Sequence, residues 1–364
     1  MKLTIQRDKF LEGLQVVQSI VSSRTTLPIL GNVLIKTGEG EISLSTTDLD
    51  TGIRTAVEAK IEKAGGVTLP ARRLFSIIRE LPVSEITLEV DSKQHASIRS
   101  GNSFFKIMGL PEEDFPPFPK TEGANLFKLD QAVFKDMLKK TAYAMSADES
   151  RYVLNGSLLS FKDNKLNVVA TDGRRLALVE HDIDFPKASE TDVILPTKAV
   201  NELQRILSDK GEVTFAISEN QISFTVGNTF LVSKLIEGNY PNYRQVVPSE
   251  TKERITIERE LLLNSARRVA LLSSEKSNSI KLSFGKNILE ISANTPDVGE
   301  ARESLAISYK GKEFSIAFNP EYLADPLRNL DSPEITIDFT DELSPGVIRY
   351  NKPFLYVIMP MRTA

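Results

Sequence analysis

The sequence contains no cysteine and only two histidines, His95 and His181. Without cysteine, the chain can form neither a disulfide nor a thiolate metal site, and it has no cysteine nucleophile. The two histidines show no metal-ligand spacing. No apolar run approaches 18 residues, and the first residues lack the apolar core of a signal peptide. We therefore expect a cytoplasmic protein, which also fits a chain without disulfides.

Motifs for catalysis are missing as well. The sequence has no P-loop and no G-x-S-x-G motif. Asp48 and Asp172 follow similar alternating segments, and one hypothesis is a hydrolase, such as a metal-dependent nuclease, that uses both carboxylates. The alternative is a turn, because aspartate at a strand end bonds its own backbone, and Thr295 stands at the third equivalent position. We favour turns, and we expect no enzyme activity, no cofactor and no metal.

The length and composition indicate a multidomain globular protein. The chain of 364 residues exceeds one domain, and 41% hydrophobic and 26% charged residues are ordinary globular values. The 45 basic and 49 acidic side chains give a formal net charge of −4. A mildly acidic balance argues against a nucleic-acid-binding protein unless the basic side chains gather on one surface.

Three blocks of sequence recur in the same order, about 120 residues apart. The first is an alternating strand followed by a polar turn, the second is a strand that leads through proline into a helix, and the third is another alternating strand. They occupy residues 41–48, 165–172 and 288–295; residues 67–70, 193–196 and 316–320; and residues 85–90, 212–217 and 334–339. Each repeat also begins with a strand and a helix. In the second repeat Asp130 is suited to cap that helix, with Leu129 and Phe134 as a hydrophobic staple.

This pattern predicts three tandem α+β domains. Each repeat reads as strand, helix, several strands, helix and several strands. The period is too long for a solenoid, so we expect separate domains, each with antiparallel sheets and two helices. The boundaries lie in the proline-rich stretch 111–124 and in residues 247–252, which gives domains of residues 1–122, 123–249 and 250–364. A duplicated domain whose copies have unrelated functions is the alternative.

Basic residues concentrate on the predicted helices. The helices over residues 71–81, 131–145 and 197–207 direct apolar side chains to one face, whereas many acidic residues fall on strands and loops. The outward basic residues, which we expect to be exposed, are Arg72, Arg73, Arg79, Lys135, Lys139, Lys198 and Arg205. If the helices share one side of the protein, an acidic chain presents one basic surface that can meet DNA. A monomeric repeat protein that binds DNA would show the same bias.

Several short motifs resemble the bacterial DNA polymerase III β-subunit family, the sliding clamps. The motifs are residues 26–32 (TLPILGN), 155–156 (NG), 170–176 (ATDGRRL), 240–243 (YPNY) and 357–362 (VIMPMR). The similarity runs along the whole chain and includes the threefold repeat. It implies a non-enzymatic head-to-tail dimeric ring, with the sheets outside and the helices inside, around duplex DNA. It also implies a processivity factor at the nucleoid, which a clamp loader places on DNA and which tethers the replicative polymerase and other proteins through short peptides.

The resemblance further implies roles for individual residues. It adds Arg24, Arg151 and Tyr152 to the DNA-facing residues given above. The partner-peptide pocket would comprise Leu154, Thr171, Gly173, Arg174, Arg175, Leu176, Pro241, Val246, Val357, Met359, Pro360, Met361 and Arg362. The dimer interface would pair Phe105 and Ile107 with Leu271 and Leu272, and would set Arg72, Arg73 and Arg99 against Glu300 and Glu303. The departures from the family pattern are Val153, at a DNA contact, and Arg174 and Gln245, which bear on the peptide preference.

The end of the chain gives a physical reason for such a pocket. Residues 356–362 (YVIMPMR) place two methionines around a proline. Proline stops a regular strand, so we expect the last strand to end near Met359 and Met361 to lie beyond the sheet. Flexible methionine suits a surface that accepts several peptides, with Arg175 and Arg362 as hydrogen-bond donors to the peptide. The alternative is that the two methionines fill the core of the third domain.

Overall fold

The computed structural model describes residues 1–362 except residues 22–26, 83, 119–124, 249, 274–277 and 297. Contacts divide the chain into two compact units, Met1–Lys135 with Asn201–Leu235, and Asp136–Val200 with Ile236–Ala364. The division passes through the helices α3 (Gln131–Thr141) and α4 (Thr197–Ile206), so the second repeat contributes to both units. None of the described helices is long and apolar enough to span a membrane.

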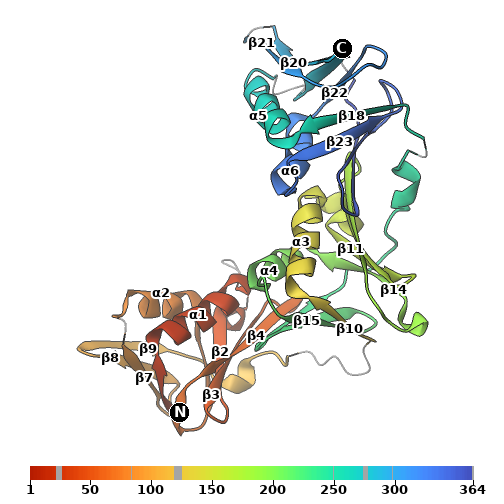
Figure 1. The fold of residues 1–364 in the computed structure, drawn as a ribbon. Coiled ribbons are helices and arrows are strands. Elements are labelled where there is room, and N and C mark those ends of the chain that lie inside the picture. Colours follow the sequence, from red (N-terminus) through yellow and green to blue (C-terminus); the bar gives the residue numbers. More distant parts are fainter. Residues whose placement is uncertain are drawn as a thin grey trace. The chain divides into compact units, whose positions relative to one another are not determined.

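The predicted repeat is present three times (Figure 1). The first repeat contains β1 (Lys2–Gln6), α1 (Arg7–Val17), β2 (Asn32–Thr37), β3 (Glu41–Thr47), β4 (Thr51–Glu58), β5 (Lys60–Lys63), β6 (Gly66–Pro70), α2 (Ala71–Glu80), β7 (Glu85–Val90), β8 (His95–Ser100) and β9 (Ser103–Met108). The second contains β10 (Asn125–Asp130), α3, β11 (Gly156–Lys162), β12 (Lys165–Thr171), β13 (Arg175–Asp182), β14 (Thr191–Pro196), α4, β15 (Glu212–Ile217), β16 (Gln221–Val226) and β17 (Thr229–Lys234). The third contains β18 (Glu253–Glu258), α5 (Arg259–Ala270), β19 (Ile280–Gly285), β20 (Ile288–Thr295), β21 (Gly299–Ala306), β22 (Phe314–Phe318), α6 (Pro320–Asn329), β23 (Glu334–Phe339), β24 (Gly346–Arg349) and β25 (Phe354–Ile358).

The described strands form four antiparallel sheets, two of which run from one repeat into the next. In the order β10-β15-β16-β17-β4-β3-β2-β6, strand β17 of the second repeat pairs with β4 of the first. In the order β14-β11-β12-β13-β25-β24-β23-β18, strand β13 of the second repeat pairs with β25 of the third. The other two sheets, β5-β1-β7-β8-β9 and β21-β20-β19-β22, end in β9 and β21. Strand β9 is the equivalent in the first repeat of β17 and β25 in the other two. Strand β21 is the equivalent in the third repeat of β4 and β13.

The two junctions between repeats have the same register. At the first, Leu231 of β17 lies opposite Ile53 of β4. At the second, Tyr356 of β25 lies opposite Ala177 of β13. Within their own repeats Leu231 and Tyr356 hold equivalent positions, and so do Ile53 and Ala177. The junction is therefore a repeated piece of structure, built twice from different residues.

An extended segment after the first repeat crosses the sheet toward the first junction. Leu110 and Thr68 of β6 exchange two backbone hydrogen bonds, each 3.0 Å long. Farther along, the ring of Phe118 lies 6.0 Å from the ring of Phe230 of β17. Gly52 of β4 makes room for this ring, because a Cβ atom at Gly52 would sit only 3.0 Å from Phe118. The segment thus holds strands of both repeats.

A second extended segment begins in the same way after β17. The Ile236 N–H donates to the carbonyl of Ile194 in β14 at 3.0 Å. Tyr240, Tyr243 and Val247 then pack on a buried apolar cluster that spans the second junction. The cluster comprises Leu158, Val169, Leu176, Ile194, Val347, Leu355 and Val357. Each connecting segment therefore covers a junction on the sheet face, and burial of its aromatic rings stabilises that junction.

Local sequence sets the helix ends. Asp130 accepts the N–H of Ala132 at 2.8 Å at the start of α3, as predicted. The α-helix ends at Thr141, so its predicted end at residue 145 is wrong, and a 3-10 turn over Ala142–Ala144 follows. In that turn the carbonyl of Tyr143 accepts a hydrogen bond from the Arg175 side chain instead of a helical N–H. In the first and third repeats α1 packs against α2 and α5 against α6 (Figure 1).

Candidate partner-peptide site and nucleic-acid surface

The turn between β12 and β13 lies beside the second junction. The Asp172 Oδ1 atom accepts the N–H groups of Arg174 at 2.8 Å and Arg175 at 3.0 Å. The Thr171 hydroxyl donates to the Arg175 carbonyl at 2.6 Å and accepts the Gly173 N–H at 3.1 Å. Gly173 has a φ of +85°, which glycine adopts without strain. Side chains of the turn itself therefore fix its shape.

The first repeat contains the same turn. Asp48 Oδ1 accepts the N–H groups of Asp50 at 3.1 Å and Thr51 at 2.7 Å, and the Thr47 hydroxyl donates to the Thr51 carbonyl at 3.0 Å. The prediction that Asp48 and Asp172 form turns is therefore confirmed. Each carboxylate serves as an acceptor within its own turn, as the turn interpretation predicts.

The guanidinium group of Arg175 makes three hydrogen bonds inside the protein. Its side chain is only 10% exposed. The Nε atom donates to Asp172 at 3.1 Å, Nη1 donates to Asp325 of α6, and Nη2 donates to the carbonyl of Tyr143. The guanidinium also lies over the ring of Tyr322, 4.4 Å from its centroid. Three of the five guanidinium N–H groups of Arg175 are thus used inside the protein. Its expected role as a hydrogen-bond donor to a peptide stays a prediction.

Tyr356 closes this network from β25. Its hydroxyl donates to the Tyr322 carbonyl at 2.7 Å. Burial raises the pKa of Tyr356 far above its usual value. The hydroxyl therefore stays protonated and uncharged next to the guanidinium of Arg175.

The chain end runs past the turn after the last strand. Strand β25 ends at Ile358, as the proline predicted. The Met359 N–H then donates to the Arg174 carbonyl at 3.0 Å, and the Met361 N–H donates to the Ala317 carbonyl at 2.8 Å. Met359 is 41% exposed, while Pro360 and Met361 are half-buried and Arg362 is exposed. The two methionines thus lie along the surface of the second junction rather than deep in the core.

Apart from half-buried Arg175, the predicted pocket residues fall into two groups by burial. Leu154, Thr171, Leu176 and Val357 are buried, and Leu176 pairs with Val357 across the junction. The residues at the surface are Gly173, Arg174, Pro241, Val246, Met359 and Arg362, which are exposed, and Pro360 and Met361, which are half-buried. The buried group supports the surface group from below.

One cavity joins several of these surface residues. Val246 and Met359 line a hollow of about 750 Å³ together with Gln245, which the sequence analysis noted, and Pro345, which it did not. The remaining lining residues are Arg244, Val247, Pro248, Glu250, Thr340 and Ser344. Pro241 lines a different, smaller hollow of about 290 Å³. The residues from 340–345 lie on a loop after β23 whose polar sequence offered no signal.

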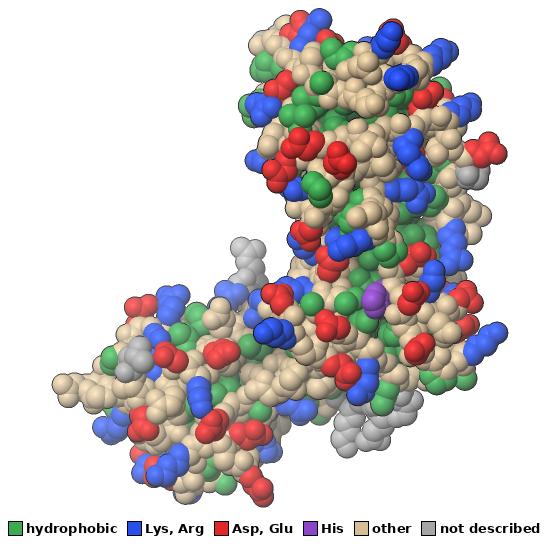
Figure 2. Space-filling view, in the orientation of Figure 1, with side chains coloured by type: hydrophobic (Ala, Val, Ile, Leu, Met, Phe, Trp, Pro, Cys, Tyr) green, Lys and Arg blue, Asp and Glu red, His purple; other side chains and the backbone are tan. Residues whose placement is uncertain are grey.

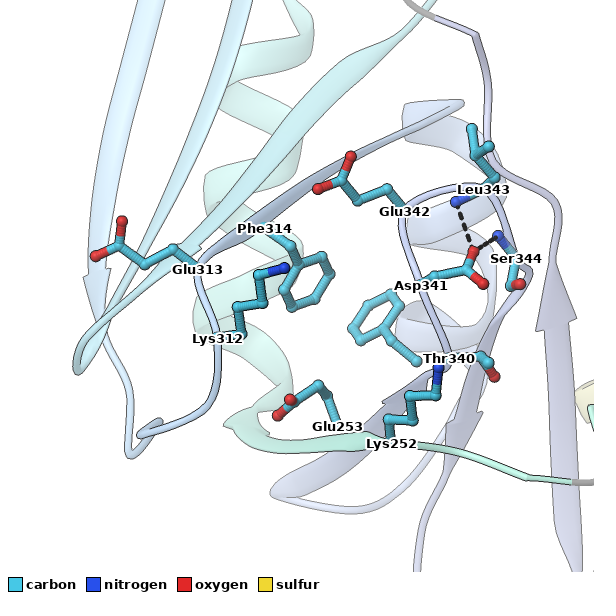
Figure 3. Close-up of a pocket in the computed structure, with 11 residues that line it drawn as sticks. Lys252, Glu253, Lys312, Glu313, Phe314, Thr340, Asp341, Glu342, Leu343 and Ser344 are labelled. Atoms are coloured by element: carbon cyan, nitrogen blue, oxygen red, sulfur yellow. Dashed lines mark hydrogen bonds between the residues drawn. The ribbon is translucent and has the colours of Figure 1, made fainter.

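A second cavity adjoins the first in the third repeat. Figure 3 shows the side chains of Phe314, Lys312, Glu253 and Glu342 among those that surround it. Its volume is about 540 Å³, and it shares Thr340 and Ser344 with the cavity beside Met359. Asp341 accepts the N–H groups of Leu343 at 2.9 Å and Ser344 at 2.8 Å, which holds the loop between the cavities.

The predicted DNA-facing residues of α2 are exposed. Arg72, Arg73 and Arg79 all project from the helix into solvent, although Arg72 also donates to the Val21 carbonyl at 3.2 Å. Arg24 lies outside the described residues. Figure 2 shows Lys and Arg side chains interspersed with Asp and Glu on the face in view, without a large area of one sign.

Two further DNA-facing candidates sit next to the turn of the second repeat. Arg151 and Tyr152 are exposed in a 3-10 segment, Glu149–Leu154. The Arg151 Nη1 atom donates to the Asp172 carbonyl at 2.9 Å, so this arginine supports the turn between β12 and β13 as well as facing solvent. Tyr152 is 59% exposed, which leaves its ring open to a ligand, and the neighbouring Val153 is half-buried.

Several predicted basic residues are tied to acidic partners. Lys135 is half-buried and lies 2.8 Å from Asp209, and Lys139 is exposed and lies 3.2 Å from Asp331. Lys198 is half-buried. These contacts reduce the positive charge that the helices offer to DNA.

Arg205 of α4 makes the most internal contacts among these residues. It donates to the Gln15 carbonyl at 3.0 Å, to the Val16 carbonyl, to the Ser19 hydroxyl at 2.6 Å and to Glu202 at 3.1 Å. The arginine therefore caps the C-terminal end of α1, where carbonyls lack helical partners. Arg205 is exposed, as predicted, but these contacts also give it a role in holding the end of α1, and its contact with DNA stays a prediction.

We predict that Arg205→Ala lowers the free energy of unfolding by about 2–3 kcal/mol, because buried Glu202 and the helix end lose their donor. Arg73→Ala, at an exposed site on α2, should change it by less than about 0.5 kcal/mol. Urea denaturation followed by circular dichroism measures both. Equal stability of the two variants would show that Arg205 does not support α1.

The predicted dimer residues differ in exposure. Phe105 is 39% exposed on the edge strand β9, and Leu271, just after α5, is 81% exposed. Ile107 points to the same side of β9 but is only 9% exposed, because it packs opposite Ala96 inside its own sheet. Leu272 is half-buried. Ile107 is thus mainly a core residue, and Phe105 and Leu271 are the ones that the monomer leaves uncovered.

The two predicted acidic interface residues lie on edge strand β21. Glu300 is exposed and pairs with Arg302 on its own strand. Glu303 is half-buried and accepts from Arg268 at 2.9 Å through Oε1, while its Oε2 atom is buried without a hydrogen-bond partner. Opposite them in the prediction, Arg99 is exposed on β8, 4.7 Å from the ring of Phe104.

Family models match the chain three times in succession. The N-terminal, central and C-terminal domains of the DNA polymerase III beta subunit match residues 1–119, 128–242 and 244–362. The chain belongs to the DNA polymerase III beta subunit family. The resemblance that the motifs indicated is thereby confirmed, and so is the threefold organisation.

Curated relatives of this family align over the whole chain. The beta sliding clamp of Chlamydia muridarum is 37% identical over 362 residues, which is 100% of this chain and 99% of the relative. The beta sliding clamp of Bacillus subtilis is 33% identical over 377 residues, with both chains covered completely. The chain accordingly has the function of a DNA sliding clamp.

Solved sliding clamps have the same fold. The clamp from Bartonella birtlesii bound to griselimycin is 37% identical with a TM-score of 0.95, and the clamp from Pseudomonas aeruginosa bound to griselimycin is 34% identical with a TM-score of 0.96. Each comparison covers 100% of both chains. The predicted α+β fold with three clamp domains is therefore confirmed.

Proposed function

We propose that two copies of this DNA polymerase III beta subunit close head to tail into a ring around duplex DNA and hold replication proteins there without catalysing a reaction. The observation that supports this most strongly is the repeated junction. A closed ring of these domains needs three kinds of contact: first with second, second with third, and third with first. The first two lie within one protein chain. Strands β9 and β21 remain as edges of the sheets at the third. Unpaired edge strands favour pairing with another chain.

The internal junctions predict the register of the third. Leu231, Tyr356 and Phe105 are equivalent, because each lies opposite the corresponding residue of the strand before it. Ala301, Ile53 and Ala177 are equivalent for the same reason, because each lies opposite the corresponding residue of the preceding strand. Since Leu231 lies opposite Ile53 and Tyr356 lies opposite Ala177, we expect Phe105 of one copy to lie opposite Ala301 of the other.

Side chains at this register complement one another. Counting along antiparallel strands from the Phe105–Ala301 pair places Lys106 opposite Glu300 and Phe104 opposite Arg302. The first pair joins opposite charges, and the second sets a guanidinium against an aromatic ring. Phe105, with no partner beyond its own sheet, would lie against the small side chain of Ala301. Opposite charges and matched sizes favour this register over a shift by one residue, which would bring each side chain to the other face.

The helix contacts agree with the strand contacts. At the first junction Ser19, just after α1, bonds to Glu202 of α4 at 2.8 Å. The equivalent positions at the proposed third junction are Leu271, after α5, and Ser76 of α2. The polar pair Ser19–Glu202 of the first junction would thus correspond to exposed Leu271 of one copy facing Ser76 of the other. Leu271 would bury its side chain on α2 of the other copy, worth about 1.5–3 kcal/mol when complete.

We predict that Lys106→Glu and Glu300→Lys each weaken the dimer, and that the double variant recovers it. Each single change sets like charges opposite each other in both interfaces of the ring. At up to ~1 kcal/mol per cross-strand pair, two interfaces raise the dimer Kd by about thirtyfold. Sedimentation equilibrium measures the Kd.

Lys281→Glu is the matched control, because this exposed lysine lies on β19, away from the sheet edge. Its dimer Kd should remain within about twofold of the original protein. A double variant that dimerises no better than the single variants would refute the register.

DNA contacts of such a ring are expected to be electrostatic and independent of sequence. Exposed Arg72, Arg73 and Arg79 on α2 support phosphate contacts, and exposed Tyr152 supports a contact with a base or sugar. The peptide site is proposed at the surface formed by the turn of Gly173, the methionines of the chain end and Val246. A short peptide with two apolar anchors should bind there with a Kd on the order of micromolar.

The remaining partners follow from the same function. A closed ring needs a clamp loader to open it on DNA, and the replicative polymerase and other replication or repair proteins would bind through short peptides. We place the protein at the nucleoid, where its DNA lies. We also propose domain boundaries at 122/123 and 249/250. The second keeps Tyr240–Val247 with the sheet that it covers, although the family models divide the chain at 242/244.

A further inference from the structure

The guanidinium of Arg175 connects three separate parts of the second junction. Through Asp172 it reaches the turn that carries Gly173 and Arg174. Through Asp325 and the ring of Tyr322 it reaches α6 of the third domain. Through the Tyr143 carbonyl it reaches the end of α3. Because the Arg174 carbonyl also accepts the N–H of Met359, these contacts form one continuous path from α6 to the chain end.

The first repeat shows that the turn itself does not need an arginine. There Thr51 stands at the position of Arg175, and the turn nevertheless has the same hydrogen bonds from Asp48 and Thr47. The guanidinium of Arg175 therefore contributes something other than the local shape of the turn. What it adds is attachment to α6 and to the end of α3.

Burial makes this attachment strong and specific. The side chains of Arg175, Asp172 and Asp325 are 10%, 15% and 20% exposed. Arg328 also contacts Asp325 at 3.2 Å, so the carboxylate of Asp325 is held by two arginines. Arg328 contacts Glu321 as well, at 3.0 Å. Charge-assisted hydrogen bonds at low exposure are stronger than those at the surface and require fixed geometry.

We propose that Arg175 is a positioning residue of the partner-peptide site, which fixes the turn and the chain-end methionines relative to α6 and does not itself contact the peptide. This inference rests on the proposed function. It predicts that the acidic partner on α6 matters as much to peptide binding as the arginine does. It also distinguishes Arg175 from Arg174, whose side chain is exposed at the same turn.

The test compares Arg175→Met with Asp325→Ala in the full-length protein. The probe is a synthetic peptide with one leucine and one phenylalanine, and calorimetry measures its affinity. If Arg175 positions the site, both changes should weaken binding by about tenfold or more. If Arg175 instead contacts the peptide, Asp325→Ala should leave affinity unchanged or increase it, because the guanidinium is released. That outcome would overturn the proposal.

Glu321→Ala is the matched control. Glu321 lies on the same helix and pairs with Arg328, but it does not contact Arg175. Its peptide affinity should stay within about twofold of the original protein. An equal loss in this variant would mean that any acidic residue of α6 has the same effect, and would refute a specific role for Asp325.

Amide hydrogen exchange supplies a readout that does not depend on peptide binding. The N–H of Met359, which donates to the Arg174 carbonyl and so reports the attachment of the turn to the chain end, should exchange faster in Arg175→Met and Asp325→Ala, and at an unchanged rate in Glu321→Ala. If the original protein binds no such peptide, the proposed peptide site is wrong. If exchange is unchanged in Arg175→Met and Asp325→Ala, the proposed attachment of the turn through Arg175 is wrong. Should Asp325→Ala fail to fold, Arg175→Lys keeps the charge but not the forked geometry and should show the same two losses.

Discussion

Protein loaded onto nicked circular DNA is expected to stay bound during gel filtration in moderate salt, and to leave once a restriction enzyme linearises the circle. A ring is linked to a circle by topology, whereas phosphate contacts by residues such as Arg72 and Arg73 weaken steeply as salt rises. The measurement is the fraction of protein that elutes with DNA before and after linearisation. We expect nearly complete loss after cutting.

Two controls make this experiment specific. The same plasmid, cut before loading, should retain almost no protein at that salt concentration. The variant with Leu271→Ala and Leu272→Ala, which should be a folded monomer, should behave on circles as the original protein does on linear DNA. Equal retention on circular and linear DNA would rule out topological linkage, and so would retention of the monomer on circles.

Truncation after Met359 is expected to reduce peptide affinity by tenfold or more. It removes the half-buried side chain of Met361 and the hydrogen bond from its N–H to Ala317. Met361→Ala should produce most of the same loss, because the apolar contact is the larger contribution. Calorimetry with a peptide that carries Leu and Phe anchors measures both.

Stability separates a surface role from a core role for these residues. The lost hydrogen bond is worth only about 1 kcal/mol, so dimerisation and thermal unfolding should remain close to those of the original protein. Leu343→Ala removes another exposed apolar side chain of the third domain, outside the cavity beside Met359, and should leave peptide affinity unchanged. Collapse of stability in the truncated protein would mean that the chain end belongs to the core.

The sequence predicted the features that depend on nearby residues. Alternation of apolar residues located the strands, and the spacing of repeated blocks located the three domains. The turns at Asp48 and Asp172 and the cap at Asp130 also follow from short-range hydrogen bonds. The end of β25 before Pro360 is a local consequence of a missing donor.

Contacts between distant residues could not be predicted in this way. Arg205 looks like any outward basic residue on a helix, yet its partners lie about 190 positions earlier. Arg175 is an ordinary turn residue until Asp325, 150 positions later, lies beside it. Lys140 is buried because its ammonium group pairs with the carboxylate of Asp136 and lies over the ring of Tyr350. Periodicity shows which face a residue is on, but not which charge it will meet.

The two connecting segments have a mechanical consequence. Phe118 covers the junction of β4 and β17, and Tyr243 covers the junction of β13 and β25. A pulling force that separates either pair of strands must also detach these aromatic rings, and the chain itself continues across the break. The proposed contact between β9 and β21 has no covalent connection of this kind between the copies. Under load in an optical trap, the ring should therefore open first where the two copies meet, at a lower force than either junction within a chain, and should reclose without refolding of a domain.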